Sequence, residues 1–358
     1  MITYNNLYKK LCSYENLMLA FRKAKKGKSK MYYVINFEQD LDNNIKLLQK
    51  ELIEDTYQPS QLKKFIVRDP KTRTIHASIF KDRIVHHAIV NLLNPIYEKV
   101  FIYDSFASRK NKGNQEGILR FESFVNKVSR NGRLIKNPYD SNSIQGYVLK
   151  CDIRKYFDSI NHEILIEIIR NKISDEKVIS LIQKILDNLN KEDGKGLPLG
   201  NYTSQFFANV YLNQLDYFVK HELKAKYYIR YVDDFVILHR SKKRLEYLRK
   251  RISEFLISLK LELHPEKTKI YPLRNGITFL GYRIFYNNRL LTRRNIKHFK
   301  KKLEGNIQLF NEGLISEEQL NCRVQGWRGY AQFGDTFNLQ QKLFSKLSSI
   351  KNLKSKDI

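Results

Sequence analysis

The sequence predicts an α+β fold, in which helices and strands follow one another without the regular strand–helix–strand period of a parallel sheet. Two kinds of segment support this prediction: short apolar runs bounded by turn residues, and longer segments with the apolar spacing of helices. With 42% hydrophobic and 12% aromatic residues, the composition is typical of a globular protein and not of a disordered one. The 358 residues suffice for one large domain or for several ordinary ones.

The first part of the chain is expected to be helical and then to form a hairpin. Residues 1–60 have helical spacing and include a basic cluster at residues 22–30. Residues 61–80 contain two apolar runs separated by Asp69 and Pro70, and these turn residues predict a β-hairpin.

The next helix is expected over residues 81–101, with an interruption near Pro95 and with His86 and His87 as a pair on its surface. Residues 122–146 are polar and predict a loop or insertion. The remaining elements are expected in this order: a buried strand running into a turn at 146–157, helices at 161–173, 176–190 and 203–224, a strand–turn–strand at 227–239, a helix at 241–260, a hairpin at 276–291 and a basic helical segment to the end.

The charge of the chain predicts the kind of partner. Lys and Arg number 65 against 37 Asp and Glu, a formal net charge of +28. An excess of this size repels itself, so a polyanionic partner is the expected reason for it. We therefore expect the protein to bind nucleic acid, the alternative being a basic enzyme without such a partner.

The cysteine, histidine and hydropathy patterns exclude several classes of protein. Cys12, Cys151 and Cys322 are far apart and odd in number, so they predict no disulfide framework and fit a reducing cytosol. The eight histidines lack zinc-ligand spacing. No apolar run reaches the ~18 residues of a membrane span, and the N-terminus has no signal-peptide pattern. We expect a cytoplasmic protein with no membrane partner.

Two adjacent carboxylates, Asp233 and Asp234, interrupt the apolar and aromatic stretch YYIRYVDDFVILH at residues 227–239. A tight hairpin turn favours Asn-Gly or Asp-Gly because its backbone needs a positive φ, so Asp-Asp is a poor choice on backbone grounds. Burying two like charges is also costly unless a cation offsets their repulsion. Because Mg²⁺ binds carboxylate oxygens and keeps substrate phosphates among its ligands, the pair suggests a platform for metal-bound phosphates. The alternative is an exposed surface turn.

A third carboxylate, Asp152, ends another apolar strand, just before the aromatic pair Tyr156 and Phe157. Two strand ends that carry carboxylates can converge to hold two Mg²⁺ ions, which at a separation of ~3.5–4 Å clamp the attacking and leaving oxygens of an in-line phosphoryl displacement. The sequence therefore predicts a two-metal site for phosphoryl transfer.

The order of these motifs along the chain resembles that of reverse transcriptases, in particular the enzymes of bacterial and phage retroelements. The resemblance covers roughly residues 60–345 and rests on these stretches: FIVRDPKTRTIHASIFKDRIVHHAIVNLL (65–93), SFASRKNKGNQEGI (105–118), CDIRKYFDSI (151–160), GLPLGNYTSQFFANVYL (196–212), YVDD (231–234), LHPEKTKI (263–270) and ITFLGYRI (277–284).

The resemblance implies a right-hand polymerase that copies RNA into DNA, with two Mg²⁺ ions as cofactors, dNTPs as substrates, and template RNA and the RNA/DNA hybrid as partners. The implied domains are an N-terminal helical basic extension (1–60), fingers (61–145), a palm with an antiparallel sheet (146–285, with fingers elements near 190–205), and a helical thumb with a short basic tail (286–358).

The resemblance also assigns roles residue by residue. Asp152, Asp233 and Asp234 are implied as metal ligands, with Ile153 included in the metal set and the backbone after Asp152 cradling the triphosphate. Lys267 matches the lysine that protonates pyrophosphate. Phe157 matches the steric gate that blocks a ribose 2′-OH, the alternative being ordinary core packing. The other implied residues are Arg68 and Arg73 on the triphosphate, Leu199, Gly200 and Gln205 beside the nucleotide, and Phe279, Leu280 and Gly281 in the primer grip.

The stretch LGNYTSQ, residues 199–205, departs from the Gln-Gly-x-x-x-Ser-Pro signature of many reverse transcriptases: Leu199 replaces the Gln, and Gln205 replaces the Pro. An aliphatic side chain removes a polar tether beside the incoming nucleotide, so base pairing would be checked less strictly. This variant resembles the enzymes of diversity-generating retroelements, which copy a template-repeat RNA with frequent errors at adenines for mutagenic retrohoming. It implies a partner, the accessory variability determinant protein, a small basic helical oligomer. The alternative is that Leu199 only packs.

Two other functions stay open at this stage. A retron or phage-defence reverse transcriptase would share most of the pattern, and an RNA-binding splicing factor on an inactive polymerase fold would not need the complete carboxylate set. Trp327, Tyr330 and Phe333 have helical spacing, which predicts core packing in the thumb. We expect no zinc-finger or nuclease module beyond this region.

Overall fold

The structure is a computed structural model that describes residues 3–69, 71–189 and 193–344. The chain divides into two compact units, and each is described by itself. The first unit comprises residues 1–110, 151–235 and 247–268, and the second comprises residues 111–150, 236–246 and 269–358. Among the described residues, no helix is both long enough and apolar enough to cross a membrane.

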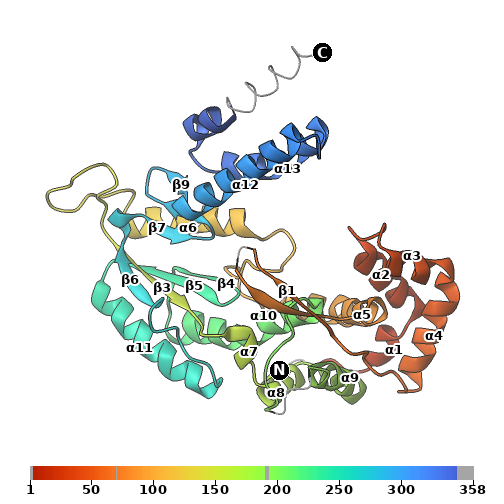
Figure 1. Cartoon of the computed structure of the whole chain (residues 1–358). Coiled ribbons are helices and arrows are strands. Elements are labelled where there is room, and N and C mark those ends of the chain that lie inside the picture. The colour runs from red at the N-terminus through yellow and green to blue at the C-terminus, as the bar shows by residue number, and fades with distance from the viewer. Residues whose placement is uncertain (1–2, 70, 190–192, 345–358) are drawn as a thin grey trace. The chain divides into compact units, whose positions relative to one another are not determined.

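The N-terminal part of the first unit is helical, as predicted (Figure 1). One of these helices begins with a side-chain cap: the Ser13 hydroxyl accepts a hydrogen bond of 3.2 Å from the Asn16 N–H at the start of α2. The long helix that follows continues through Pro95, near which an interruption was expected. The helices of this part are α1 (Tyr8–Leu11), α2 (Tyr14–Lys25), α3 (Tyr32–Gln39), α4 (Leu41–Ile53) and α5 (Phe80–Tyr97).

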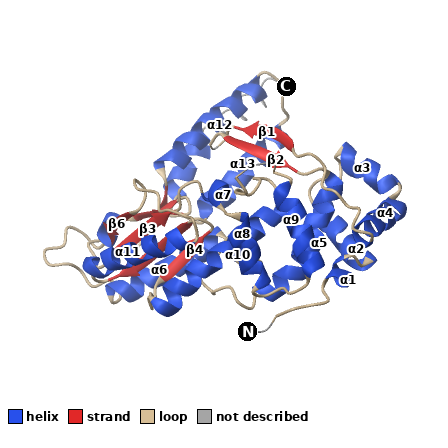
Figure 2. Ribbon diagram, turned by 90° about the horizontal axis from the view of Figure 1, so that it is seen from below, coloured by secondary structure: helices blue, strands red, loops and turns tan. Residues whose placement is uncertain are grey.

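The predicted hairpin is present as strands β1 (Lys63–Val67) and β2 (Arg73–Ala77), which Figure 2 draws as a red pair. The strands are antiparallel, and Val67 pairs with Arg73 next to the connecting turn. Of the two residues that predicted the turn, Asp69 lies within it, whereas Pro70 lies outside the described residues. Every residue of β1 is exposed, so the hairpin is held by its main-chain ladder more than by a core.

The rest of the first unit is a set of amphipathic helices next to the YVDD hairpin. Asn161 and Asp175 cap two of these helices with their side chains. The helix expected over 203–224 begins at Tyr202 and passes into a π-helical turn at Phe218–Glu222. The elements are α7 (Tyr156–Ser159), α8 (His162–Arg170), α9 (Glu176–Asp187), α10 (Tyr202–Tyr217), β4 (Tyr228–Tyr231) and the part of α11 (Lys242–Ser258) from residue 247 on.

The central sheet has the strand order β4-β5-β3-β6, formed with β3 (Tyr147–Asp152), β5 (Asp234–His239) and β6 (Lys269–Pro272). Strands β3 and β6 are antiparallel, with Tyr147 opposite Pro272. Strand β5 follows β4 after a turn of two residues, as predicted for residues 227–239. The interior of β5 is fully buried, which explains its continuous apolar run.

The prediction of a loop over residues 122–146 is wrong for its first part, because residues 122–129 of the second unit are helical. They belong to α6 (Asn114–Ser129), whose buried face carries Phe121 and Phe124. The loop prediction failed for these residues because polar residues follow Ser129 directly and obscure the end of an amphipathic stretch. This unit also has a three-stranded antiparallel sheet of β7 (Ile277–Phe279), β8 (Tyr282–Ile284) and β9 (Arg289–Leu291).

Helices α12 (Arg293–Asn311) and α13 (Glu317–Gln332) of the second unit lie side by side (Figure 1). Their shared core includes Phe299 and Leu320, and the Trp327 ring stacks on Phe299 with centroids 3.7 Å apart. Tyr330 and Phe333 pack against Tyr282. The prediction that these aromatic residues form a core is therefore confirmed.

A buried ion pair lies beneath the YVDD hairpin in the first unit. Arg230 and Asp216 have fully buried side chains, and the guanidinium donates two hydrogen bonds to the carboxylate, at 2.7 and 2.6 Å. The same guanidinium donates to the Asn209 amide oxygen at 3.0 Å and to the Val232 main-chain oxygen at 3.2 Å. Tyr228 donates its hydroxyl to Asp216 at 2.7 Å. The hairpin is thus anchored from below by a satisfied charge pair.

Replacing Asp216 by Asn is expected to lower the free energy of unfolding by about 3–5 kcal/mol, because it leaves the Arg230 charge buried without a carboxylate. Denaturant unfolding would measure this loss. A matched control is Asp42→Asn, which breaks an exposed pair with Lys46 at 2.6 Å and is expected to change little, since water screens exposed charges. Equal unfolding midpoints for the two variants would contradict the assignment.

Candidate active site

The turn of the YVDD hairpin presents the two adjacent aspartates. Val232 has φ +55°, a left-handed conformation that is unfavourable for a β-branched residue. Asp233 completes the turn and Asp234 begins β5. The hydrogen bond from Arg230 to the Val232 oxygen supports this strained backbone. The sequence therefore has valine in a strained turn conformation that glycine would adopt without strain, which is typical of a functional position.

The end of β3 brings Asp152 to this turn. The Ile153 N–H donates a hydrogen bond of 3.3 Å to the Asp233 main-chain oxygen, so the two predicted acidic segments are direct neighbours. On its other side, the Asp152 main-chain oxygen accepts 2.7 Å from the His264 N–H. The predicted convergence of distant strand ends is therefore present within the first unit.

The raised pKa of Asp233 reflects its burial and the closeness of these acidic groups. Burial, together with the negative charges of Asp152 and Asp234, raises the pKa of Asp233 to about 6, while Lys267 opposes them. The Lys267 Nζ lies 2.9 Å from the Asp152 Oδ1. Three acidic groups thus share one region, and a lysine partly compensates their charge.

The donor set suits a hard divalent cation. Oxygen-rich, mutually repelling carboxylates are what Mg²⁺ binds in proteins, and a cation would relieve the repulsion that raises the Asp233 pKa. Within residues 3–69, 71–189 and 193–344, however, no group of three or more His, Cys, Asp and Glu side chains is arranged to hold a metal ion. The aspartates are neighbours and not a formed ligand cage, and one oxygen of Asp152 faces Lys267.

The backbone after Asp152 is only partly available to a triphosphate. The N–H groups of Ile153 and Arg154 already donate to the main-chain oxygens of Asp233 and Glu262. Lys155, at the start of α7, has φ +43°, so the chain turns sharply there. The predicted cradle is therefore confined to Lys155 and the residues that follow it.

The two aromatic residues after Asp152 have different environments. Tyr156 is 2% exposed and donates its hydroxyl to the Ala208 oxygen, so it belongs to the core. Phe157 is only half-buried, and its main-chain oxygen accepts 2.7 Å from the Leu197 N–H. The partial burial of Phe157, five positions after Asp152, leaves both the gate and the packing alternative open.

A cavity of about 340 Å³ brings several predicted substrate residues together in the first unit. Arg73, Leu199 and Asp158 all line it, so β2, α7 and the segment before α10 meet there. Arg68, which follows β1, is exposed and does not line this cavity.

Gly200 is required by its surroundings. It has φ +113°, and a Cβ at this position would lie 2.7 Å from the Ile75 Cγ2 atom. The neighbouring Leu199 oxygen accepts 2.9 Å from the His76 N–H. Gln205 is exposed on α10, where its amide oxygen accepts a hydrogen bond of 3.3 Å from Ser108, and it does not line the cavity.

The predicted surface position of His86 and His87 is wrong. His86 is 3% exposed, and His87 is half-buried with its ring stacked on Tyr202 at 4.5 Å. The helix α5 is buried on most of its circumference, so its polar residues lie inside as well. Polarity alone misplaced them, because the buried histidine has hydrogen-bond partners in the core.

The predicted primer grip belongs to the second unit. Leu280 and Gly281 form the turn between β7 and β8, with φ values of +47° and +91°. The Gly281 oxygen accepts hydrogen bonds from the Tyr330 hydroxyl at 3.1 Å and the Asn295 amide at 3.2 Å. Phe279 is completely buried. The tip of this hairpin is therefore held by hydrogen bonds from α12 and α13, which restrict the motion of its main chain.

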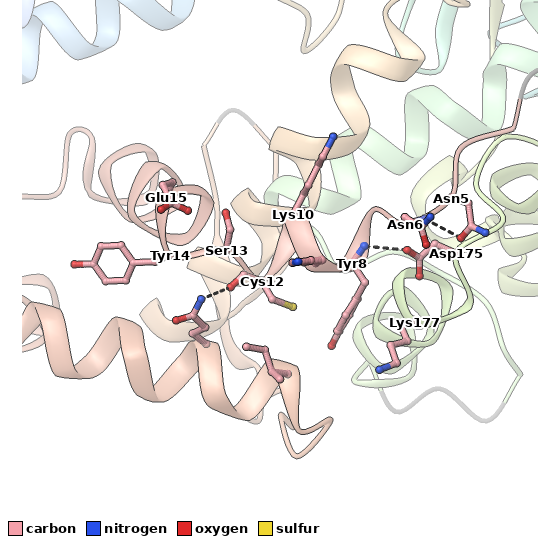
Figure 3. Close-up of a pocket in the computed structure, with 13 residues that line it drawn as sticks. Asn5, Asn6, Tyr8, Lys10, Cys12, Ser13, Tyr14, Glu15, Asp175 and Lys177 are labelled. Atoms are coloured by element: carbon pink, nitrogen blue, oxygen red, sulfur yellow. Dashed lines mark hydrogen bonds between the residues drawn. The ribbon is translucent and has the colours of Figure 1, made fainter.

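A larger cavity, of about 1030 Å³, lies among the N-terminal helices and contains none of the predicted site residues (Figure 3). Asp175 accepts hydrogen bonds there from the N–H groups of Leu7 and Tyr8, at 2.7 and 2.9 Å. The same carboxylate caps α9. Because Asp175 satisfies two helix starts, its role is structural.

Sequence reasoning missed the residues that support the site. Arg230 and Asp216 anchor the turn, and Ser78, His86, Asn201 and Thr203 form a buried polar cluster next to Leu199. The signal for the first pair was present: an arginine inside an apolar run must find an acid if it is buried. The second set has no such signal, because its members are neutral and far apart in the chain.

The neighbouring aspartates, Lys267 and the 340 Å³ cavity all belong to the first unit. Residues 63–284 match the reverse transcriptase (RNA-dependent DNA polymerase) family, and the chain belongs to this family. Its class is therefore an RNA-directed DNA polymerase, and the predicted right-hand polymerase fold is that of the family.

Individual relatives are distant. The chain is 25% identical to YkfC of Escherichia coli over 283 residues, which cover 67% of this chain and 71% of that protein. It is 25% identical over 341 residues to the group II intron-encoded protein LtrA of Lactococcus lactis, covering 75% of this chain and 54% of LtrA. A telomerase structure from Candida albicans is 12% identical, with a TM-score of 0.48, and covers 82% of this chain and 55% of that one. The chain thus spans about half the length of LtrA and of the telomerase chain.

Proposed function

We propose that this protein copies a template RNA into cDNA with Asp152, Asp233 and Asp234 as the ligands of two Mg²⁺ ions. The observation that carries the proposal is the hydrogen bond between Ile153 and Asp233, which holds the three carboxylates in one region. When bound, the two ions would lower the pKa of the primer hydroxyl and stabilise the departing pyrophosphate.

The residues of the chain have distinct parts in this proposal. Asp152 and Asp233 bind the ions from two strand ends, and Asp234 supports them. Lys267, which is half-exposed and beside Asp152, donates a proton to the pyrophosphate. Arg73 binds the triphosphate electrostatically at the rim of the cavity, and Arg68 does so near the hairpin turn.

Replacing Asp233 by Ala is expected to abolish primer extension on an RNA template while leaving RNA binding nearly unchanged, because RNA affinity comes from the basic surface and not from the acids. Extension and filter binding would be measured side by side. The control is Asp187→Ala, an exposed residue of α9, which is expected to retain full extension. Retained extension in the Asp233 variant would refute the metal assignment.

We further propose that Phe157 selects deoxynucleotides. Its ring is half-buried next to the core residue Tyr156, which limits its freedom to move away from a ribose. The main-chain bond to Leu197 connects it with the wall of the nucleotide cavity.

Replacing Phe157 by Ala is expected to raise the efficiency of rNTP incorporation relative to dNTP incorporation by at least about tenfold, because steric exclusion is lost. Single-nucleotide extension with dNTP and rNTP series would measure the ratio. Tyr156→Phe, which removes only a core hydroxyl, is the matched control and should keep the ratio of the wild type. An unchanged ratio in the Phe157 variant would remove the gate role.

For the biological reaction we propose error-prone copying of a template-repeat RNA, as in a diversity-generating retroelement. The support is Leu199, an aliphatic side chain that lines the same cavity as Arg73. A hydrocarbon surface there offers no hydrogen bond to a base pair, so a mispair loses less binding energy. The proposed domain boundaries, the cytoplasmic location and the accessory variability determinant protein stay predictions.

Replacing Leu199 by Gln is expected to lower misincorporation opposite template adenine, because the amide restores a polar contact that depends on correct geometry. Sequencing cDNA from a defined adenine-containing template would measure it. Leu189→Gln is the matched control, since Leu189 lines the same cavity from a different segment. An unchanged error spectrum for Leu199→Gln would favour a retron or phage-defence enzyme.

A further inference from the structure

Two segments that carry predicted nucleotide-binding residues run together beside the 340 Å³ cavity. One is the end of β2, which follows Arg73, and the other is the stretch of chain that leads from Leu199 into α10. The His76 N–H donates to the Leu199 oxygen at 2.9 Å, and Gly200 lets the two backbones approach closely. The relative position of Arg73 and Leu199 therefore depends on what holds these segments together.

Four buried polar side chains lie at this junction: Ser78, His86, Asn201 and Thr203, called the junction network below. Each is at most 3% exposed. The Ser78 N–H and hydroxyl both lie near the Asn201 Oδ1, at 3.0 and 2.9 Å. The His86 ring reaches Ser78 Oγ with Nε2 at 3.3 Å and Thr203 Oγ1 with Nδ1 at 2.6 Å.

The direction of every hydrogen bond in the junction network follows from the chemistry of its members. The Asn201 Oδ1 can only accept, so the Ser78 hydroxyl donates its single proton to it. Nε2 of His86 must then carry a hydrogen and donate to Ser78 Oγ. Nδ1 is left as the acceptor for the Thr203 hydroxyl. Each of these side-chain hydrogen bonds then has one donated proton. Together they join Thr203 in α10, His86 in α5, Ser78 just after β2 and Asn201 just before α10.

This chain requires a neutral histidine. Burial, together with the charges of His87 and Arg83, lowers the pKa of His86 to about 3. A second ring proton would turn Nδ1 into a donor and break the link with Thr203. The junction network is thus fixed in one proton arrangement at neutral pH.

We propose that His86 is a positioning residue for the incoming nucleotide, which through Ser78 and Thr203 holds the Leu199–Gly200 backbone in register with the Arg73 strand. The proposal rests on the function proposed above for the cavity as the dNTP site. His86 does not line the cavity and touches no substrate; it acts by fixing two walls that do. A shift of about 1 Å between such walls is enough to weaken binding of a reacting group.

The expected kinetic effect differs from that of losing a metal ligand. Because the junction network supports the nucleotide cavity and not the carboxylates, its loss should weaken dNTP binding with little effect on the chemical step. The KM for dNTP is therefore expected to rise by about tenfold while kcat stays within about twofold.

The test is steady-state primer extension by the full-length protein with varied dNTP. His86→Leu removes both ring contacts, Thr203→Val removes one with almost no change of shape, and His86→Gln restores an acceptor and a donor. We expect raised KM for the first two and a partial return toward the wild-type KM for His86→Gln. If His86→Leu does not fold, Thr203→Val alone carries the test.

The matched control is Tyr57→Phe, which removes a buried hydrogen bond of 2.8 Å to Asp82 away from the cavity. It is expected to lower thermal stability without changing the KM for dNTP. An unchanged KM in Thr203→Val, or an equal rise in Tyr57→Phe, would overturn the positioning role. Absence of extension by the wild-type protein would instead contradict the proposed function itself, so the two failures are distinguishable.

Discussion

The site depends on keeping like charges together. Asp152 and Asp233 come from strands far apart in the sequence, and the main-chain hydrogen bond between Ile153 and Asp233 makes their segments neighbours. The burial and mutual repulsion of the acids appear as the raised pKa of Asp233. A fold that holds carboxylates in this way contains an unfavourable interaction that a cation or a proton relieves, which supports the proposed binding of divalent metal.

Such a site needs support that does not itself compete for the metal. Lys267 offsets part of the charge from the solvent side, where it is half-exposed. Arg230 is neutralised by Asp216 and donates a hydrogen bond to the Val232 oxygen, so it anchors the backbone of the turn. The buried pair therefore contributes geometry and leaves the negative potential of the site largely intact.

The sequence predicted the parts of this structure that have a local pattern. The hairpin at residues 61–80 carried a turn signal, and the acids at strand ends were visible as breaks in apolar runs. What it did not predict depends on contacts between distant segments. His86 was misplaced because a polar residue on a helix is usually exposed, and its partners Ser78 and Thr203 are recognisable only once the chain is folded. The helical residues 122–129 were missed because their polar neighbours obscured the end of an amphipathic stretch.

Charge and rigidity are supplied by different residues at the proposed nucleotide site. Arg68 and Arg73 are exposed, so their guanidinium groups stay hydrated until a triphosphate replaces the water. The junction network, in contrast, is buried and neutral, and it holds the backbone without adding charge beside the phosphates. A protonated histidine in its place would bring a third positive charge but would lose the link to Thr203. The buried, neutral His86 therefore fixes the backbone but adds no positive charge. The positive charge comes from exposed basic residues, because a charged group loses less hydration at the surface than in the core.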